Sequence, residues 1–148
     1  MKKPALFIDR DGTINRDCPY CKDVRDLYVY PDAVGIISEY ASRGFLIIII
    51  TNQSGINRGY FTVREMEEFN AALKRRVTQM GGRIDDLFYC PHTPEEKCEC
   101  RKPETGLIWQ AIEKYDIDIV NSIMVGDRED MDGELARRVG INFILLKH

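Results

Sequence analysis

The sequence predicts an α/β protein, in which a doubly wound (Rossmann-like) sheet of five parallel strands carries helices on both faces. Two observations predict this fold class. Short apolar runs of strand length alternate along the chain with segments whose apolar residues recur at helical spacing. The runs at residues 5–9 and 45–50 lack polar alternation, which is typical of parallel strands covered on both faces. We find no linker, repeat or low-complexity stretch, so we expect a single domain over residues 1–148.

The first helix is expected between these two strands, over residues 31–42. Pro31 fits the first turn of a helix, because the N–H that proline lacks would be unpaired there. Gly44 suits the left-handed conformation that ends many helices. This segment therefore gives the first strand–helix–strand unit of the sheet.

A long second helix is expected over residues 62–80. Thr62 and Glu65 have the spacing of a capping box, in which each side chain pairs with the other residue's backbone N–H. The two glycines at 81 and 82 end the helix. Its apolar residues fall on one face and are Met66, Phe69, Leu73 and Val77.

The second half of the chain continues the alternation. We expect strands at residues 86–90, 122–125 and 142–146, and helices at 106–115 and 133–139. Sheets of this kind bind ligands outside the carboxyl ends of their strands, where the strand order switches. The chemistry should therefore lie in the polar segments that follow the strands.

Composition excludes several classes of function. Lys and Arg total 21 against 24 Asp and Glu, so nothing indicates generic nucleic-acid binding. No apolar run approaches the roughly 20 residues that span a membrane. Five cysteines in a chain without a signal-peptide pattern favour metal ligands or free thiols over disulfides. We expect a cytoplasmic monomer that binds a small molecule and neither nucleic acid nor membrane.

Acidic residues follow the first and fourth expected strands. Asp9 and Asp11 lie on one side of an extended backbone and are followed by Gly12, which permits a sharp turn. Asp9, Asp127 and a backbone carbonyl near Asp11 would give the hard oxygen ligands that suit Mg²⁺. Asp132 either supports this metal site or caps the following helix. By itself, the Asp-x-Asp-Gly pattern would also fit a strand that ends in a polar turn.

Two further segments could hold a phosphate group. Thr51 ends the second strand with a hydroxyl and exposed backbone amides. Lys102 could neutralise a phosphoryl group, and Arg101 could bind a carboxylate or a second phosphate through two parallel hydrogen bonds. The alternatives are a capped turn for the first segment and a solvated basic pair for the second.

A metal clip is predicted in the loop over residues 90–100. Its four candidate ligands suit tetrahedral Zn²⁺ in a closed structural site, and they are Cys90, His92, Cys98 and Cys100. The alternative is three buried thiols and a surface histidine. The Cys18-x-x-Cys21 pair shows no helix amino terminus to activate it, so free thiols are expected there.

Taken together, these motifs resemble those of the haloacid dehalogenase superfamily of phosphohydrolases. The chain resembles most closely its D-glycero-D-manno-heptose 1,7-bisphosphate phosphatases. The resemblance covers nearly the whole chain and rests on Asp9–Thr13, Thr51–Ile56 with Arg58-Gly59 and Phe61-Thr62, Cys90-Pro91-His92, Cys98–Pro103 with Gly106, and Gly126-Asp127 with Asp132. Histidinol-phosphate phosphatases share the zinc loop. Only five residues separate His92 from Cys98, a short loop like theirs.

The resemblance implies a mechanism. Asp9 would be the nucleophile and form an aspartyl-phosphate. Asp11, expected to stay protonated beside its anionic neighbour, would protonate the leaving alkoxide and then activate water. Thr51 and Lys102 would hold the phosphoryl oxygens. Asp9, the backbone oxygen of Asp11 and Asp127 would hold Mg²⁺.

The resemblance also implies a substrate pocket without a separate cap domain. The substrate would be D-glycero-D-manno-heptose 1,7-bisphosphate, which would lose its 7-phosphate. Three alternatives stay open: histidinol phosphate, a polynucleotide 3′-phosphate end, and a non-catalytic zinc-bearing phosphate-binding module. The implied substrate-binding residues are Asp17, Cys18, Pro19, Tyr20, Asn52, Gln53, Ser54, Arg101 and Arg128.

Overall fold

The apolar run that starts the chain forms β1 (Ala5–Ile8), and all four of its side chains are buried. The computed structural model describes residues 2–148. β1 pairs in parallel with a strand on each side, which explains why the run has no polar alternation. The sheet order is β3-β2-β1-β4-β5. The other strands are β2 (Leu46–Asn52), β3 (Asp86–Cys90), β4 (Ile123–Gly126) and β5 (Asn142–Leu145).

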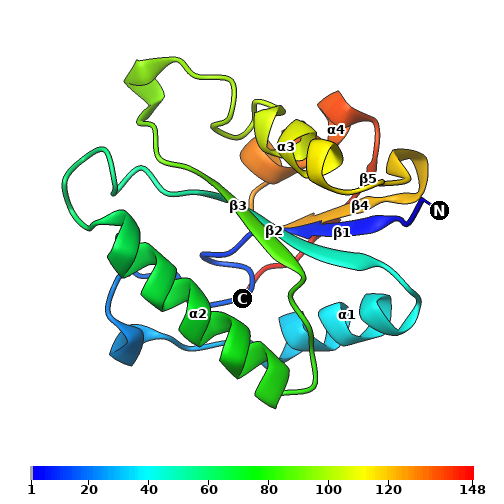
Figure 1. Cartoon of the computed structure of the whole chain (residues 1–148), viewed down its shortest axis with the longest axis horizontal. Coiled ribbons are helices and arrows are strands. Elements are labelled where there is room, and N and C mark those ends of the chain that lie inside the picture. The colour runs from blue at the N-terminus through cyan, green and yellow to red at the C-terminus, as the bar shows by residue number, and fades with distance from the viewer. Residues whose placement is uncertain (1) are drawn as a thin grey trace.

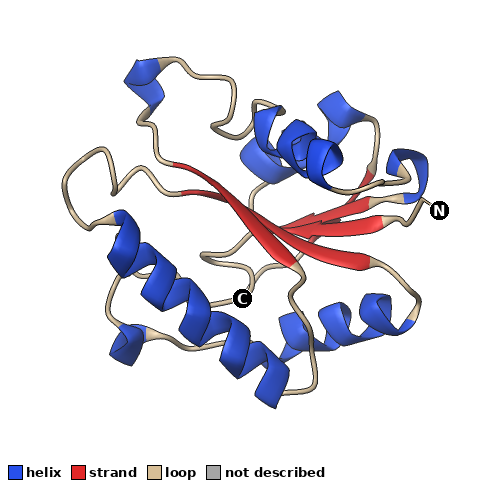
Figure 2. Ribbon diagram, in the orientation of Figure 1, coloured by secondary structure: helices blue, strands red, loops and turns tan. Residues whose placement is uncertain are grey.

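Helices cover both faces of this sheet (Figures 1 and 2). Leu6 and Ile8 of β1 face one apolar core, which contains side chains of α1 and α2. Ala5 and Phe7 face the opposite core, which contains side chains of α3 and α4. Successive strand residues point to opposite faces, so one strand serves both cores. The helices are α1 (Pro31–Ser42), α2 (Val63–Gln79), α3 (Gly106–Lys114) and α4 (Glu134–Val139).

The doubly wound fold is therefore confirmed, and it places a switch point beside β1. The chain runs from β1 to β2 on one side, and it returns to β4 on the other side. The carboxyl ends of these three strands flank the opening where ligands bind in such sheets. Asp9, Thr51 and Asp127 all lie at this edge.

Short turns of helix, which periodicity cannot detect, occupy several connections. They are the 3₁₀ turns Val24–Asp26, Pro94–Glu96 and Ile119–Asn121, and the π-helical turn Glu129–Gly133. The expected capping box at Thr62 and Glu65 is present. Among residues 2–148, no helix combines the length and apolar character needed to cross a membrane.

Asp86 links β3 to the end of α3. Its Oδ2 accepts hydrogen bonds from Lys114 Nζ at 2.7 Å and Tyr115 Oη at 2.6 Å. Partial burial favours the neutral form, but these hydrogen bonds outweigh it and hold the pKa of the Asp86 carboxyl below its ordinary value of 3.8. The charged form is therefore the one that stabilises the fold.

We expect Asp86→Asn to lower the free energy of unfolding by no more than about 1 kcal/mol near neutral pH, since Lys114 is largely exposed. A depressed folded pKa gives stability above the unfolded value of 3.8, and this stability is lost as pH falls through the folded value. Urea unfolding across pH should show a constant difference between wild type and variant above about pH 5, which vanishes in strong acid. A difference that persists in strong acid would contradict the assignment.

Candidate active site

A buried lysine bridges two acids at the switch point. Lys102 Nζ donates to Asp9 Oδ1 at 2.7 Å and to Asp132 Oδ1 at 2.8 Å, and the Lys102 side chain is 3% exposed. The charges of the two acids raise the pKa of the Lys102 ammonium against the effect of burial, so it stays charged. An ammonium has three protons, and within residues 2–148 the two acids accept two of them, which leaves one for a ligand. The cation thus reaches the end of β1 from a loop that lies 93 residues further along the chain.

Three carboxylates converge at the same point. Ligand oxygens of Asp9, Asp127 and Asp132 lie within 4.8 Å of one another. Burial and a neighbouring carboxylate raise the pKa values of Asp9 and Asp127. Thr13 Oγ1 lies 3.2 Å from Asp9 Oδ2 and 3.0 Å from Asp127 Oδ1, but one hydroxyl proton can satisfy only one of them. An all-oxygen set with excess negative charge fits a hard divalent cation such as Mg²⁺.

Glycine allows two of these acids to approach the backbone. Gly12 has φ +86°, and a Cβ at this position would lie 2.5 Å from Asp127 Oδ2. A Cβ at Gly126 would lie 2.2 Å from Asp132 Oδ2. Asp132 was predicted either to support the metal site or to cap a helix. It does not cap α4, whose first flanking residue is Gly133, and its contacts with Lys102 place it in the acidic cluster.

Asp11 has surroundings quite different from those of Asp9. Arg10 binds both of its carboxylate oxygens, Asn15 Nδ2 donates to Oδ1 at 3.0 Å, and Gln53 Nε2 donates to Oδ2 at 3.0 Å. Burial opposes ionisation, but the Arg10 charge and these hydrogen bonds outweigh it and lower the pKa of Asp11. This direction contradicts the expectation that Asp11 stays protonated beside its anionic neighbour. That expectation considered the charge of Asp9 and a position away from the cation, and it did not include the Arg10 charge.

A cavity of about 430 Å³ opens over these groups. It includes every predicted catalytic and substrate-binding residue except Cys18. Its lining comprises Asp9, Asp11, Asp17, Pro19, Tyr20, Thr51, Asn52, Gln53, Ser54, Gly55, Arg101, Lys102, Asp127, Arg128, Met131 and Asp132. The sequence motifs that lie far apart along the chain thus meet in one concave site.

Two polar residues of the lining make contacts that the sequence did not indicate. Asn52 pairs with the backbone of Lys102, accepting from its N–H at 2.9 Å and donating to its carbonyl at 3.3 Å. Gln53 Nε2 donates to Thr51 Oγ1 at 2.9 Å as well as to Asp11. Both residues therefore position predicted catalytic groups from the end of β2.

The outer wall of the cavity carries cations and an aromatic ring. Arg128 pairs with the exposed Asp130. Arg101 donates from Nη1 to the backbone carbonyl of His92 at 3.2 Å, which ties it to the cysteine-rich loop. Tyr20 packs edge-on against Tyr60, with ring centroids 4.6 Å apart, and so joins two loops around the opening. This wall brings two cationic side chains to the cavity.

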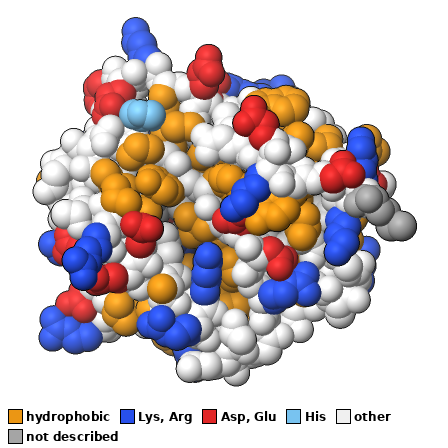
Figure 3. Space-filling view, in the orientation of Figure 1, with side chains coloured by type: hydrophobic (Ala, Val, Ile, Leu, Met, Phe, Trp, Pro, Cys, Tyr) orange, Lys and Arg blue, Asp and Glu red, His pale blue; other side chains and the backbone are white. Residues whose placement is uncertain are grey.

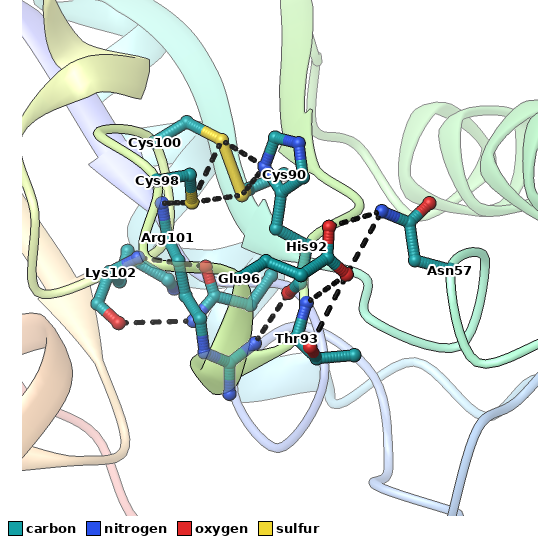
Figure 4. The surroundings of a disulfide bond; sticks show 10 residues. Asn57, Cys90, His92, Thr93, Glu96, Cys98, Cys100, Arg101 and Lys102 are labelled. Carbon is teal, nitrogen blue, oxygen red and sulfur yellow. Dashed lines mark hydrogen bonds between the residues drawn. A yellow bond between two sulfur atoms is a disulfide. The ribbon is translucent and has the colours of Figure 1, made fainter.

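The four predicted zinc ligands lie together in the loop after β3, and Figure 4 shows their side chains converging. His92 Nδ1 lies 3.4 Å from Cys90 Sγ and 3.3 Å from Cys100 Sγ, and Cys98 Sγ lies 3.5 and 3.7 Å from the same sulfurs. Bond lengths of about 2.3 Å to sulfur and 2.0–2.1 Å to nitrogen give tetrahedral ligand spacings of about 3.5–3.8 Å. The donor types and these four spacings therefore fit zinc, whereas the sulfurs of Cys90 and Cys100 are bonded to each other.

The cysteines differ from the expectation that metal ligands or free thiols are favoured over disulfides. The structure joins Cys90 to Cys100 and Cys18 to Cys21 in disulfides and leaves Cys98 free. The turn at Cys18-x-x-Cys21 brings the two Cα atoms to 5.4 Å, a separation that a disulfide can span. The prediction of free thiols overlooked this turn. A Cys90–Cys100 disulfide and a zinc ion are mutually exclusive, because zinc requires free thiolates.

The parallel sheet gathers two aspartates separated by one residue, a threonine, a lysine and a third acid at its switch point. This arrangement defines a phosphohydrolase of the haloacid dehalogenase class. A family model described as "HAD-hyrolase-like" matches residues 99–148. A probable D-glycero-D-manno-heptose-1,7-bisphosphate 7-phosphatase of Thermoplasma volcanium is 54% identical over 97% of this chain and 99% of that one. The Helicobacter pylori D-glycero-beta-D-manno-heptose-1,7-bisphosphate 7-phosphatase is 38% identical over 97% and 84%.

Solved structures agree with these sequence relatives. The D,D-heptose 1,7-bisphosphate phosphatase of B. bronchiseptica, crystallised with magnesium and phosphate, has a TM-score of 0.86 and 31% identity over 96% of this chain and 79% of that one. This chain belongs to the heptose bisphosphate phosphatase family of haloacid dehalogenase phosphatases. It is a phosphatase with the α/β fold of that superfamily.

Proposed function

We propose that the protein removes the 7-phosphate from D-glycero-D-manno-heptose 1,7-bisphosphate through an aspartyl-phosphate on Asp9. The observation that carries the proposal is the buried Lys102, which lies 2.7 Å from Asp9 on the floor of a cavity of about 430 Å³. A phosphoryl group placed there would meet a nucleophile and a fixed positive charge together. Phosphoryl transfer depends mainly on such positioning and charge neutralisation.

The reaction would proceed in two balanced steps. In the first, an Asp9 carboxylate oxygen bonds to phosphorus, the bond from phosphorus to the sugar oxygen breaks, and Asp11 gives that oxygen a proton. In the second, water attacks phosphorus, Asp11 accepts the water proton, and the bond to Asp9 breaks to release phosphate. The charge of a phosphate bound beside Asp11 raises the pKa of this carboxyl, so substrate binding favours the acid form that the first step needs.

Asp9, Asp127 and the backbone oxygen of Asp11 would hold Mg²⁺, and Asp132, which lies in the same acidic cluster, would support the site. When bound, the cation would supply charge neutralisation for the phosphoryl oxygens. Thr51 and Lys102 would contact those same oxygens. Asn52 and Gln53 would keep these two groups in place.

The substrate's second phosphate would bind Arg101 and Arg128. Both line the cavity, and the acidic partner of Arg128, Asp130, is exposed. Histidinol phosphate, favoured by the short loop between His92 and Cys98, would instead place a cationic amine in the cavity. The two arginines would repel that amine, whereas they can bind a second phosphate through two parallel hydrogen bonds each. The contacts thus support the sugar bisphosphate over the amine.

A comparison of kcat/KM for the two substrates tests this choice. We expect the heptose bisphosphate to be preferred by at least about tenfold, and Arg101→Ala to remove most of that preference, since a lost charge-assisted contact costs about 1.5–3 kcal/mol. Glu113→Gln, exposed on α3, is the matched control. A preference for histidinol phosphate, or an Arg101→Ala variant that keeps the wild-type preference, would contradict the proposal.

A polynucleotide 3′-phosphate is the less favoured alternative. On the face drawn in Figure 3, cationic and anionic side chains intermingle, without the continuous basic band that would follow a nucleic-acid backbone. The net charge of −3 gives no general attraction either. Absence of phosphate release from 3′-phosphorylated DNA at low salt would remove this alternative.

Zinc would have a structural role in the loop that carries Arg101 and Lys102. Cys98 Sγ accepts the backbone N–H of Arg101 at 3.3 Å, so the metal cluster and the phosphate-binding cations are mechanically coupled. Zinc requires reduced thiols, which suits the cytoplasmic location that the sequence predicts. Disulfides at the same cysteines would instead suit an oxidising compartment.

Protein purified under reducing conditions is expected to contain one zinc ion per chain. Cys98→Ser and His92→Ala should lose the metal and several kcal/mol of stability, a part of the roughly 10–16 kcal/mol with which structural zinc binds at neutral pH. Glu96→Gln in the same loop, which contacts Asn57 rather than the cluster, should keep the metal. Elemental analysis and thiol titration decide the question, and a metal-free protein with only one reactive thiol would contradict the zinc assignment.

A further inference from the structure

Arg10 is an arginine buried in the protein interior, with its side chain fully inaccessible to solvent. Its Nε donates to Asp11 Oδ1 at 3.0 Å and its Nη2 donates to Asp11 Oδ2 at 2.9 Å. On the other side, Nη1 donates to Asn70 Oδ1 of α2 at 2.8 Å, and the guanidinium lies 4.7 Å from the ring centroid of Phe69. A guanidinium fixed on three sides holds its partner carboxylate in one orientation.

A purely structural role for this side chain is poorly supported by its surroundings. The turn after β1 is already closed by the backbone, because the Arg10 carbonyl accepts the N–H groups of Thr13, Ile14 and Asn15. A buried ion pair contributes little net stability compared with apolar packing of the same volume. The contacts of the Arg10 side chain therefore point to the geometry of Asp11 rather than to the fold.

We propose that Arg10, anchored by Asn70, is a positioning residue that aims the Asp11 carboxyl for proton transfer. This inference rests on the proposed function, in which Asp11 exchanges protons with the leaving oxygen and with water. Arg10 touches neither the substrate nor the reacting atoms. It binds both oxygens of the Asp11 carboxylate, which does contact the reacting atoms. Asn70 holds the Arg10 side chain against α2.

The test separates the step that needs an acid from the step that needs a base. The 7-phosphate of the heptose bisphosphate has a poor alkoxide leaving group, whereas p-nitrophenyl phosphate releases p-nitrophenolate, which needs no proton in order to leave. The ratio kcat/KM reports the first, irreversible transfer to Asp9. Loss of Asp11 positioning should therefore lower kcat/KM for the sugar ester alone, while slow hydrolysis of the aspartyl-phosphate should lower kcat for both.

For Arg10→Met we expect kcat/KM for the heptose bisphosphate to fall by about 10- to 100-fold. This loss is a part of the roughly 10²–10⁴-fold effect that a positioned general acid or base has on the rate. For p-nitrophenyl phosphate, kcat/KM should stay within about threefold of the wild-type value. A burst of p-nitrophenol should precede slow turnover. Arg10→Lys should restore only part of the sugar rate, because an ammonium lacks the planar fork. If Arg10→Met does not fold, Asn70→Ala should give the same pattern with a smaller loss.

Leu73→Ala, a buried residue further along α2, controls for loss of stability and should leave the ratio of the two kcat/KM values unchanged. A parallel fall for both esters in the Arg10 and Asn70 variants would overturn the positioning role, as would no fall for either ester. A wild-type enzyme that hydrolyses neither ester would instead overturn the proposed function. The two failures are therefore distinguishable.

Discussion

Asp9→Asn is expected to lower kcat by at least about 10⁴-fold, since loss of a covalent nucleophile costs on the order of 10⁶ in the best-studied hydrolase. The amide has the same shape as the carboxylate but cannot form the aspartyl-phosphate. Burial and the nearby Asp132 charge raise the pKa of Asp9 against the opposing charge of Lys102. The variant loses one of the two ion pairs of Lys102 but keeps the one with Asp132, so we expect it to fold with a lower free energy of unfolding than wild type.

Phosphate release measures the loss of activity in Asp9→Asn, and thermal unfolding measures whether the variant is folded. Glu113→Gln makes the same carboxylate-to-amide change at an exposed position of α3 and should match wild type in both. An Asp9→Asn protein that retains its phosphatase rate would rule out the covalent role. If the variant loses its fold as well as its activity, the broken contact with Lys102 explains the result, and the loss of activity says nothing about the nucleophile.

Lys102→Met is expected to affect both activity and stability. Without the ammonium, Asp9 and Asp132 face each other without a counter-charge, and removing one partner of a buried ion pair costs about 3–5 kcal/mol. The same change removes a phosphate-binding charge, and losing one such group lowers kcat by about 10²–10³-fold. The two acids raise the pKa of Lys102 above its ordinary 10.5, so its stabilisation is complete at neutral pH and is lost only in strong alkali.

A double variant separates these two effects. Lys102→Met with Asp132→Asn removes one of the two carboxylate charges that lose their partner, so part of the lost stability should return while activity stays low. Urea unfolding and steady-state kinetics give the two quantities. Unchanged unfolding of Lys102→Met, or recovery of activity in the double variant, would contradict the role given to this lysine.

The sequence predicted the sheet well because its strands are buried on both faces. The expected strand over residues 86–90 matches β3, and the other expected strands differ from β1, β2, β4 and β5 by one or two residues at their ends. Apolar runs and helix-ending glycines are local sequence signals, so they predict the bounds of strands and helices without any knowledge of tertiary contacts. The 3₁₀ and π-helical turns are too short to leave a periodic pattern.

The convergence of the site could also be predicted, but the local contacts could not. Parallel strands end at one edge of a sheet, which was enough to bring Asp9, Thr51 and Asp127 together. Nothing in the sequence indicates that Asp11 is held by Arg10 and Gln53. An arginine between two acids looks like an ordinary counter-charge. A signal did exist in α2, where the polar Asn70 interrupts the apolar face.

Trapping the covalent intermediate tests the central claim most directly. Asp11→Asn lacks the base that hydrolyses the aspartyl-phosphate, so p-nitrophenyl phosphate should phosphorylate the protein once and then stall. Mass spectrometry of the acid-quenched variant should show one added phosphoryl group per chain, on the peptide that contains Asp9. Turnover without any phosphoryl group on that peptide, or a phosphoryl group on another residue, would contradict the account.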